Sequence, residues 1–187
     1  MNILTSPLPD CIIWKGKAYK LNTDFRIWLK FEGIMQDSSL SAAEKTRIIR
    51  DICFAEPPPD GAALEALNDF YMCGHTQKGK DAGKNKPIVS FEQDAEYIYA
   101  AFYSQYGIDL AQSNLHWYKF HALFTGLGEE NMIVKIMHFR GMDISRIKDK
   151  NQKAFYRKMK RIYRIKGENI SAGEMLESLF NGGGDDK

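Results

Sequence analysis

One stretch, residues 91–140, constrains the fold more than any other, because its aromatic and branched side chains recur with the period of an α-helix. The first apolar series in this stretch steps by three or four residues, which places its members on one helical face. These members are Phe91, Ala95, Ile98, Phe102 and Tyr106. Gly107 follows as a helix-ending residue, since glycine adopts left-handed backbone angles at low cost. The pattern predicts one amphipathic helix.

Two further helices are predicted before residue 140. The second has an apolar series that is interrupted at Gly126 and Gly128. Its members are Trp117, Phe120, His121, Phe124 and Leu127. The third begins near Ile133 and continues to Arg140. Because the breaks are short, we expect the three helices to pack as antiparallel neighbours around one aromatic core.

The sequence before residue 75 predicts a β-hairpin followed by helices. Residues 11–21 alternate in hydrophobicity around Lys15-Gly16, which is typical of two strands joined by a tight turn. Two strands alone are marginally stable in water, so the hairpin must lie on the helices. Trp14 is the expected anchor in the core, and an exposed binding hot spot is the alternative for this side chain.

Helix boundaries in this half of the chain follow from capping residues. Asn22-Thr23-Asp24 is typical of a helix start. Ser41 and Glu44 fit a capping box, which predicts a helix from about Ala42 to Phe54 before three prolines end it. Another helix is expected from Asp60-Gly61 to Gly74, with Leu64, Leu67, Phe70 and Tyr71 as its inner face.

Residues 75–86 are polar, basic and glycine-containing, which predicts a flexible linker. They do not match a phosphate-binding loop, because only three residues lie between Gly79 and Gly83, where the motif has four, and no hydroxyl residue follows Lys84. The predicted organisation is therefore a hairpin with helices in 1–74, the linker, an aromatic-rich helical region in 87–180, and a disordered tail. That tail is 181–187, and the regions 1–74 and 87–180 can also form one continuous domain.

Positive charge is concentrated in residues 146–166. They contain ten Lys or Arg and a single acid, Asp149, whereas the remainder of the chain carries a net charge of −7. Apolar residues recur here mostly at intervals of three, four or seven, which predicts a helix with one apolar stripe and a cationic remainder. The stripe consists of Ile147, Ala154, Phe155, Met159, Ile162 and Ile165. Such a segment is a solvated face, or it binds an acidic protein, nucleic acid or a second copy of the chain.

The residues that most often perform catalysis or bind metal are scattered. His116 and His121 are five residues apart and diverge on a helix, so they do not form a helical zinc pair. We expect His116 to start or pack a helix and Asp109 to cap a turn. Three cysteines, Cys11, Cys53 and Cys73, are odd in number and dispersed, which favours reduced thiols in a cytoplasm. The sequence predicts no enzyme, cofactor or metal.

Several motifs in the aromatic stretch are shared with one family. Residues 94–102 (DAEYIYAAF), 106–110 (YGIDL) and 115–120 (LHWYKF) are followed by Leu123, Leu127, Ile136-Met137 and Arg140. With these motifs the chain resembles the gene-product-fifteen proteins, which come from the tail-gene region of phages and prophages of Gram-positive hosts. The resemblance covers about residues 10–165.

This resemblance implies a non-enzymatic role in tail assembly in the host bacterial cytoplasm. The expected function is a chaperone for the tape-measure or tail-tube protein, within a mainly α-helical bundle that carries the small N-terminal β-hairpin. The alternative is a nucleic-acid-binding phage protein that uses the basic helix 146–166. Self-association is possible, and a membrane partner is not expected. The residues expected to contact a protein partner are Tyr97, Tyr103, Tyr106, Trp117, Arg157, Lys158, Arg161 and Arg164.

Overall fold

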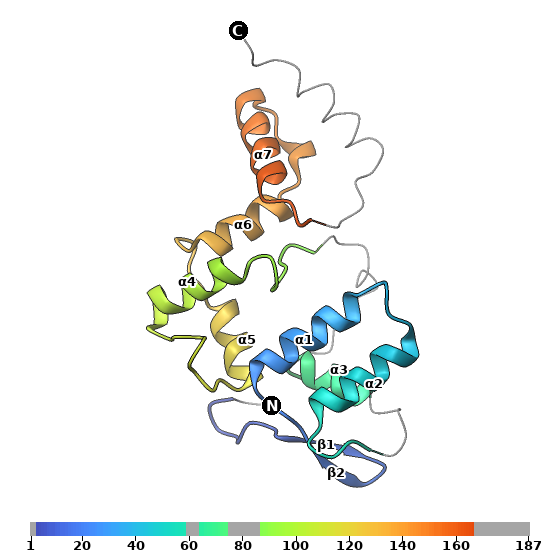
Figure 1. Ribbon diagram of the computed structural model, residues 1–187. Helices are drawn as coiled ribbons and strands as arrows, with labels where there is room; N and C mark the ends of the chain where they lie inside the picture. Colours follow the sequence, from blue (N-terminus) through green and yellow to red (C-terminus); the bar gives the residue numbers. More distant parts are fainter. Residues whose placement is uncertain (1–2, 59–63, 75–86, 167–187) are drawn as a thin grey trace. The chain divides into compact units, whose positions relative to one another are not determined.

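The computed structural model describes residues 3–58, 64–74 and 87–166, and it confirms a mainly α-helical fold with an N-terminal hairpin (Figure 1). The chain divides into two compact units, Met1–His138 and Phe139–Lys187. Residues on both sides of 75–86 belong to the first unit, and the division falls within helix α6 (Met132–Gly141). The predicted linker 75–86 and the predicted tail 181–187 lie outside the described residues.

The hairpin consists of β1 (Cys11–Trp14) and β2 (Lys17–Lys20), paired antiparallel. Lys15 and Gly16 form the turn with φ angles of 47° and 76°, which matches the right-handed twist of the strands. Ile12 lies opposite Tyr19 and is the buried residue of the hairpin. The predicted anchor, Trp14, is only half-buried beside the turn, so Ile12 has the role that the sequence suggested for Trp14.

Helices α1 (Phe25–Gln36) and α2 (Ala42–Cys53) begin where their caps predicted. The Asp24 carboxylate accepts a hydrogen bond from the Arg26 backbone N–H, and Ser41 and Glu44 form the complete capping box. Helix α1 lies against α2 and against α5 (Trp117–Thr125) (Figure 1). The side chains that α1 contributes to the core of the first unit are Phe25, Trp28 and Phe31.

Helix α3 (Leu64–Tyr71) buries Leu67 and Phe70 and lies against β1. Its predicted first turn at Asp60-Gly61 falls outside the described residues. The chain reverses at Cys73 and Gly74, which have φ angles of 54° and 73°. The Gly74 N–H donates to the Asp69 carbonyl, a pattern that satisfies free carbonyls at a helix end.

The three helices predicted in the aromatic stretch are α4 (Ala95–Tyr106), α5 (Trp117–Thr125) and α6. Gly107 ends α4 with a φ angle of 67°, as the sequence predicted. The first helix was predicted to include Phe91, but Phe91 precedes it and Ala95 is exposed. A turn occupies that position, because the buried Asp94 carboxylate accepts a hydrogen bond from the Ser90 N–H.

The aromatic core is not confined to these three helices. The Phe120 ring of α5 stacks on Phe102 of α4 at 5.1 Å and on Phe25 of α1 at 4.8 Å, measured between ring centroids. Trp117 stacks on Tyr71 of α3 at 5.3 Å. The core of the first unit therefore joins segments from both sides of residues 75–86.

In the second unit, a 3-10 helix, η2 (Ile144–Arg146), precedes helix α7 (Lys150–Ile162). Asp149 caps α7 by accepting a hydrogen bond from the Gln152 N–H. The Phe139 ring lies 6.2 Å from Tyr156 and 6.0 Å from Tyr163. The Phe155 ring also lies 6.1 Å from Phe139, so this one ring contacts both half-buried and exposed aromatic side chains of the segment.

Candidate functional site

His116 caps α5, which confirms its interpretation as a helix-start residue. Its Nδ1 accepts a hydrogen bond from the Tyr118 N–H at 3.0 Å, and its Nε2 lies 3.0 Å from the Pro9 carbonyl oxygen. These contacts require a neutral ring with the proton on Nε2. Burial lowers the pKa of His116 below its ordinary value, which favours that neutral form.

Other polar candidates have structural roles or poor reactivity. Asp109 accepts a hydrogen bond from the Ala111 N–H, as expected for a capping carboxylate. Burial raises the pKa of the Cys53 and Cys73 thiols to about 12, so neither forms a thiolate readily at neutral pH. Within the part of the chain that the structure describes, no group of three or more His, Cys, Asp or Glu side chains could hold a metal ion.

Tyr99 and Tyr103 of α4 form an exposed aromatic pair, which we call the tyrosine face, and their exposed fractions are 39% and 59%. Tyr97, a predicted partner contact, is 40% exposed but projects from another side of the helix, because it is two residues from Tyr99. Tyr99 and Tyr103 are one helical turn apart and their rings stack at 6.2 Å. The Tyr99 hydroxyl donates to the Asp109 carboxylate, which fixes one end of the stack. The opposite side of α4 is buried, so the tyrosine face is the outer side of an anchored helix.

Two residues predicted to contact a partner belong to the core instead. Trp117 is 1% exposed, and its Nε1–H donates to the Tyr71 carbonyl at 2.8 Å. Tyr106 is half-buried, and its hydroxyl donates to the Leu123 carbonyl. Both side chains therefore hold helices together. Tyr99 was missed by the sequence reasoning, although its spacing of four residues from Tyr103 was a visible signal.

The predicted basic residues Arg157, Lys158, Arg161 and Arg164 are all exposed in the second unit. The predicted apolar stripe is only partly buried: Ile165 is buried, but Phe155 and Ile162 are 50% and 55% exposed. No residue within α7 is buried. The stripe prediction was wrong for Phe155 and Ile162: the Phe155 ring contacts Phe139 at 6.1 Å but stays half-exposed, whereas Tyr156 and Tyr163 contact the same ring and are half-buried. We call the exposed series Phe155, Lys158 and Ile162 the α7 face.

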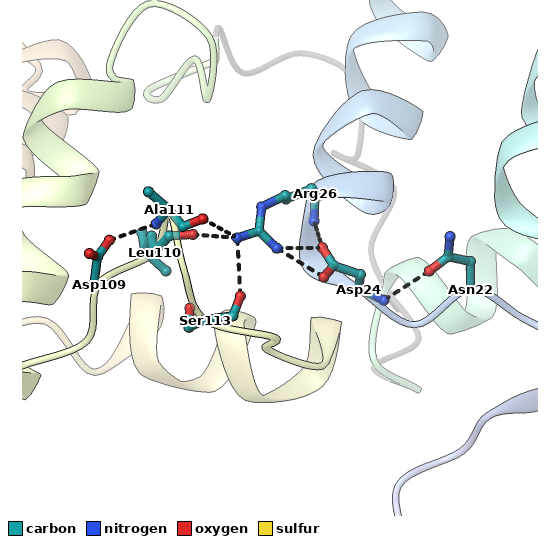
Figure 2. A network of polar contacts seen from close by, with 7 residues as sticks. All are labelled: Asn22, Asp24, Arg26, Asp109, Leu110, Ala111 and Ser113. Carbon is teal, nitrogen blue, oxygen red and sulfur yellow. Dashed lines mark hydrogen bonds and ion pairs between the residues drawn. The ribbon is translucent and has the colours of Figure 1, made fainter.

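An arginine network positions the loop between α4 and α5 (Figure 2). The Arg26 guanidinium binds the Asp24 carboxylate at 2.9 Å and donates to three backbone carbonyls of the loop. Its Nη2 lies 2.6 Å from the Leu110 oxygen, 3.1 Å from the Ser113 oxygen and 3.2 Å from the Ala111 oxygen. The loop also contains Asp109, so the network supports the residue that orients Tyr99. No local sequence signal indicated this contact, since more than 80 residues separate its partners.

The match to known families covers both faces described above. A family model described as "Bacteriophage Gp15 protein" matches residues 4–165. No curated protein and no solved structure matches the chain. In the described ranges, no helix combines the length and hydropathy needed to cross a membrane. Because the matched residues make up most of the sequence, the chain belongs to the bacteriophage Gp15 family.

Proposed function

We propose that this chain is a non-enzymatic protein of phage tail morphogenesis. In this proposal it acts in the host bacterial cytoplasm as an assembly chaperone that binds the tape-measure or tail-tube protein through the tyrosine face. Family membership supports a phage role. The observation that carries the binding role is the exposed stack of Tyr99 and Tyr103 on the outer side of a helix that buries Ile98, Ala101 and Phe102 on its inner side.

Tyrosine is well suited to such a surface. Its ring contributes a large apolar area and its hydroxyl retains a polar contact, so tyrosines are frequent at interfaces and among residues with large binding contributions. The stack and the hydrogen bond from Tyr99 to Asp109 restrict both rings before binding. Less side-chain entropy is then lost when a partner docks.

A tape-measure protein is the expected partner because a long helical chain needs cover for its apolar stripes before the tail tube encloses it. An amphipathic helix that places its apolar residues against a partner's hydrophobic surface is a common mode of recognition. The tyrosine face offers such a surface, and its flanking carboxylates can contact basic residues of a helical partner.

Co-expression with the tape-measure protein tests the proposal. We expect the wild-type chain to raise the soluble fraction of that protein and to co-elute with it on a sizing column. The double substitution Tyr99→Ala with Tyr103→Ala should abolish both effects. The matched control is Ile13→Ala. It removes an exposed apolar side chain too, but Ile13 lies on the hairpin and is 65% exposed. No gain in solubility and no complex with the wild-type chain would refute the chaperone role.

A second candidate function is nucleic-acid binding by residues 146–166. The observation in its favour is the exposed positions of Arg157, Lys158, Arg161 and Arg164 in a segment with a net charge of +9. Contacts to phosphates release counterions, so affinity for DNA would fall steeply as salt rises. A fluorescence titration with duplex and single-stranded DNA at low salt tests this function. Absence of binding at low salt would eliminate it.

A further inference from the structure

We infer that copies of this chain associate head to tail, with the α7 face of one copy docking on the tyrosine face of the next. This inference concerns the free protein and goes beyond the proposed function, because it needs no tail partner. It starts from two exposed apolar surfaces that lie in different compact units. On α4 these are the rings of Tyr99 and Tyr103, and on α7 they are Phe155 and Ile162.

The two faces have complementary charge. Residues 87–118 contain four acids and no Lys or Arg, and of these acids only Asp94 is buried. Glu96 is exposed one turn before Tyr99 on the same side of α4. Lys158 is exposed between Phe155 and Ile162, in the segment with a net charge of +9. Such complementarity favours one surface meeting the other and opposes either surface meeting itself.

The two faces also match in length. Phe155 and Ile162 are seven residues apart, which is about two helical turns or roughly 10 Å along the axis. Glu96 and Tyr103 are also seven residues apart, with Tyr99 between them. The α7 face therefore presents an apolar–basic–apolar series, and the α4 side presents an acid followed by two stacked rings. An ion pair between Lys158 and Glu96 would place Phe155 or Ile162 against the tyrosine stack.

Two predictions about the assembly follow from this arrangement. The contact area of two short helix faces is well below the roughly 1,600 Å² of a standard stable interface, so association should be weak. The interface is also heterologous, because each copy contributes a different surface at each end. Association should therefore continue past the dimer as concentration rises. A tail partner that binds the tyrosine face would compete with this association.

Sedimentation equilibrium tests the inference with the full-length chain, from about 10 µM to about 1 mM, the range in which weak complexes form. We expect the average mass of the wild type to rise with concentration beyond that of a dimer, and to rise less as salt screens the charges. Tyr99→Ala with Tyr103→Ala should weaken association at least about tenfold, and so should Phe155→Ala with Ile162→Ala. Circular dichroism of each double variant verifies that it is folded.

The decisive experiment measures the mass of an equimolar mixture of the two double variants. Each variant has lost a different surface, so an equimolar mixture retains one intact combination and should form a heterodimer but nothing larger. Lys158→Glu should weaken association, and adding Glu96→Lys to it should restore association. The control Ile13→Ala should associate as the wild type does.

Several results would overturn the inference. The wild-type chain could remain a monomer up to the highest concentration. Either double variant could associate as strongly as the wild type. The mixture of the two variants could contain only monomers. Docking of the α7 face within its own chain would give a mass independent of concentration, and this result also refutes it. Because no tail protein is present, failure here leaves the proposed function intact. Self-association without any tape-measure complex would refute only the proposed function.

Discussion

The two compact units use aromatic side chains in different ways. In the first unit two of the tryptophans are buried and their ring N–H groups are paired: Trp28 Nε1–H donates to the Asn22 carbonyl, and Trp117 Nε1–H donates to the Tyr71 carbonyl. In the second unit α7 has no buried residue, and Phe155 keeps half of its surface exposed beside Phe139. Similar residue types therefore build a core in one region and a surface in the other.

This difference indicates that a helical apolar pattern alone does not determine what a ring does. In the first unit, α1, α3 and α5 contribute rings that surround one another, so packing assigns each ring an inner position. In the second unit the Phe139 ring contacts Phe155 and Tyr156 of α7 and the ring of Tyr163, which follows that helix. Tyr156 and Tyr163 are half-buried there, whereas Phe155 and Ile162 keep 50% and 55% of their surface exposed.

The sharpest test of this comparison replaces one phenylalanine in each unit. Phe120→Ala removes a ring that is 1% exposed and stacks on Phe25 and Phe102, so we expect a loss of about 3–5 kcal/mol in the free energy of unfolding. Phe155→Ala removes a half-exposed ring and should cost less than about 1 kcal/mol. Urea unfolding followed by circular dichroism measures both. Equal losses would show that the two units do not differ in this way.

The next effect in size concerns Arg26, which belongs to the first unit. Arg26→Ala removes contacts to Asp24 and to three loop carbonyls, and we expect a loss of about 1–3 kcal/mol. The matched control in the second unit is Arg146→Ala, whose ion pair with Asp143 is exposed and should contribute far less to stability. Thermal unfolding of both variants provides the comparison. An Arg26 variant as stable as the Arg146 variant would exclude the network as a support for the loop.

A smaller effect should appear as a pH dependence that arises in the first unit. Burial lowers the pKa of folded His116 below 6.5, so the unfolded chain takes up the proton first as pH falls. The stability from this residue is therefore present above pH 6.5 and is lost as pH falls through the lower pKa of the folded state. Protonation of Nδ1 would also remove the acceptor that caps α5.

The variant His116→Asn isolates this effect, because asparagine retains an N-cap acceptor but does not titrate. Between pH 7.5 and pH 5, the wild type should lose more stability than the variant does. The measurement is the free energy of unfolding at each pH in urea. Parallel curves for the two proteins would contradict the predicted role of His116.

Much of the fold could be predicted because its signals are local. The hairpin turn at Lys15-Gly16, the capping box at Ser41 and the end of α4 at Gly107 each depend on a few neighbouring residues, and the structure confirms all three. The division after His138 had no such signal. It falls within a continuous helix and reflects contacts between distant segments.

The candidate site was harder to predict, since exposure depends on what packs against each helix. Trp117 and Tyr103 are both aromatic residues in predicted helices, yet Trp117 is buried against Tyr71 and Tyr103 is the most exposed of the α4 tyrosines. The contacts of Arg26 with residues 110–113 could not be predicted from local sequence patterns either, because they join segments far apart in the sequence. Periodicity identifies the faces of a helix, and only tertiary contacts determine which face is covered.

We propose that the buried rings maintain the fold and that the exposed rings bind a protein. The most direct test measures, on the Tyr99→Ala and Tyr103→Ala double variant, both the free energy of unfolding and the affinity for the purified tape-measure protein. We expect a stability within about 1 kcal/mol of the wild type and a complex at least about tenfold weaker. An affinity equal to that of the wild type, or a wild-type chain that forms no complex, would refute this proposal.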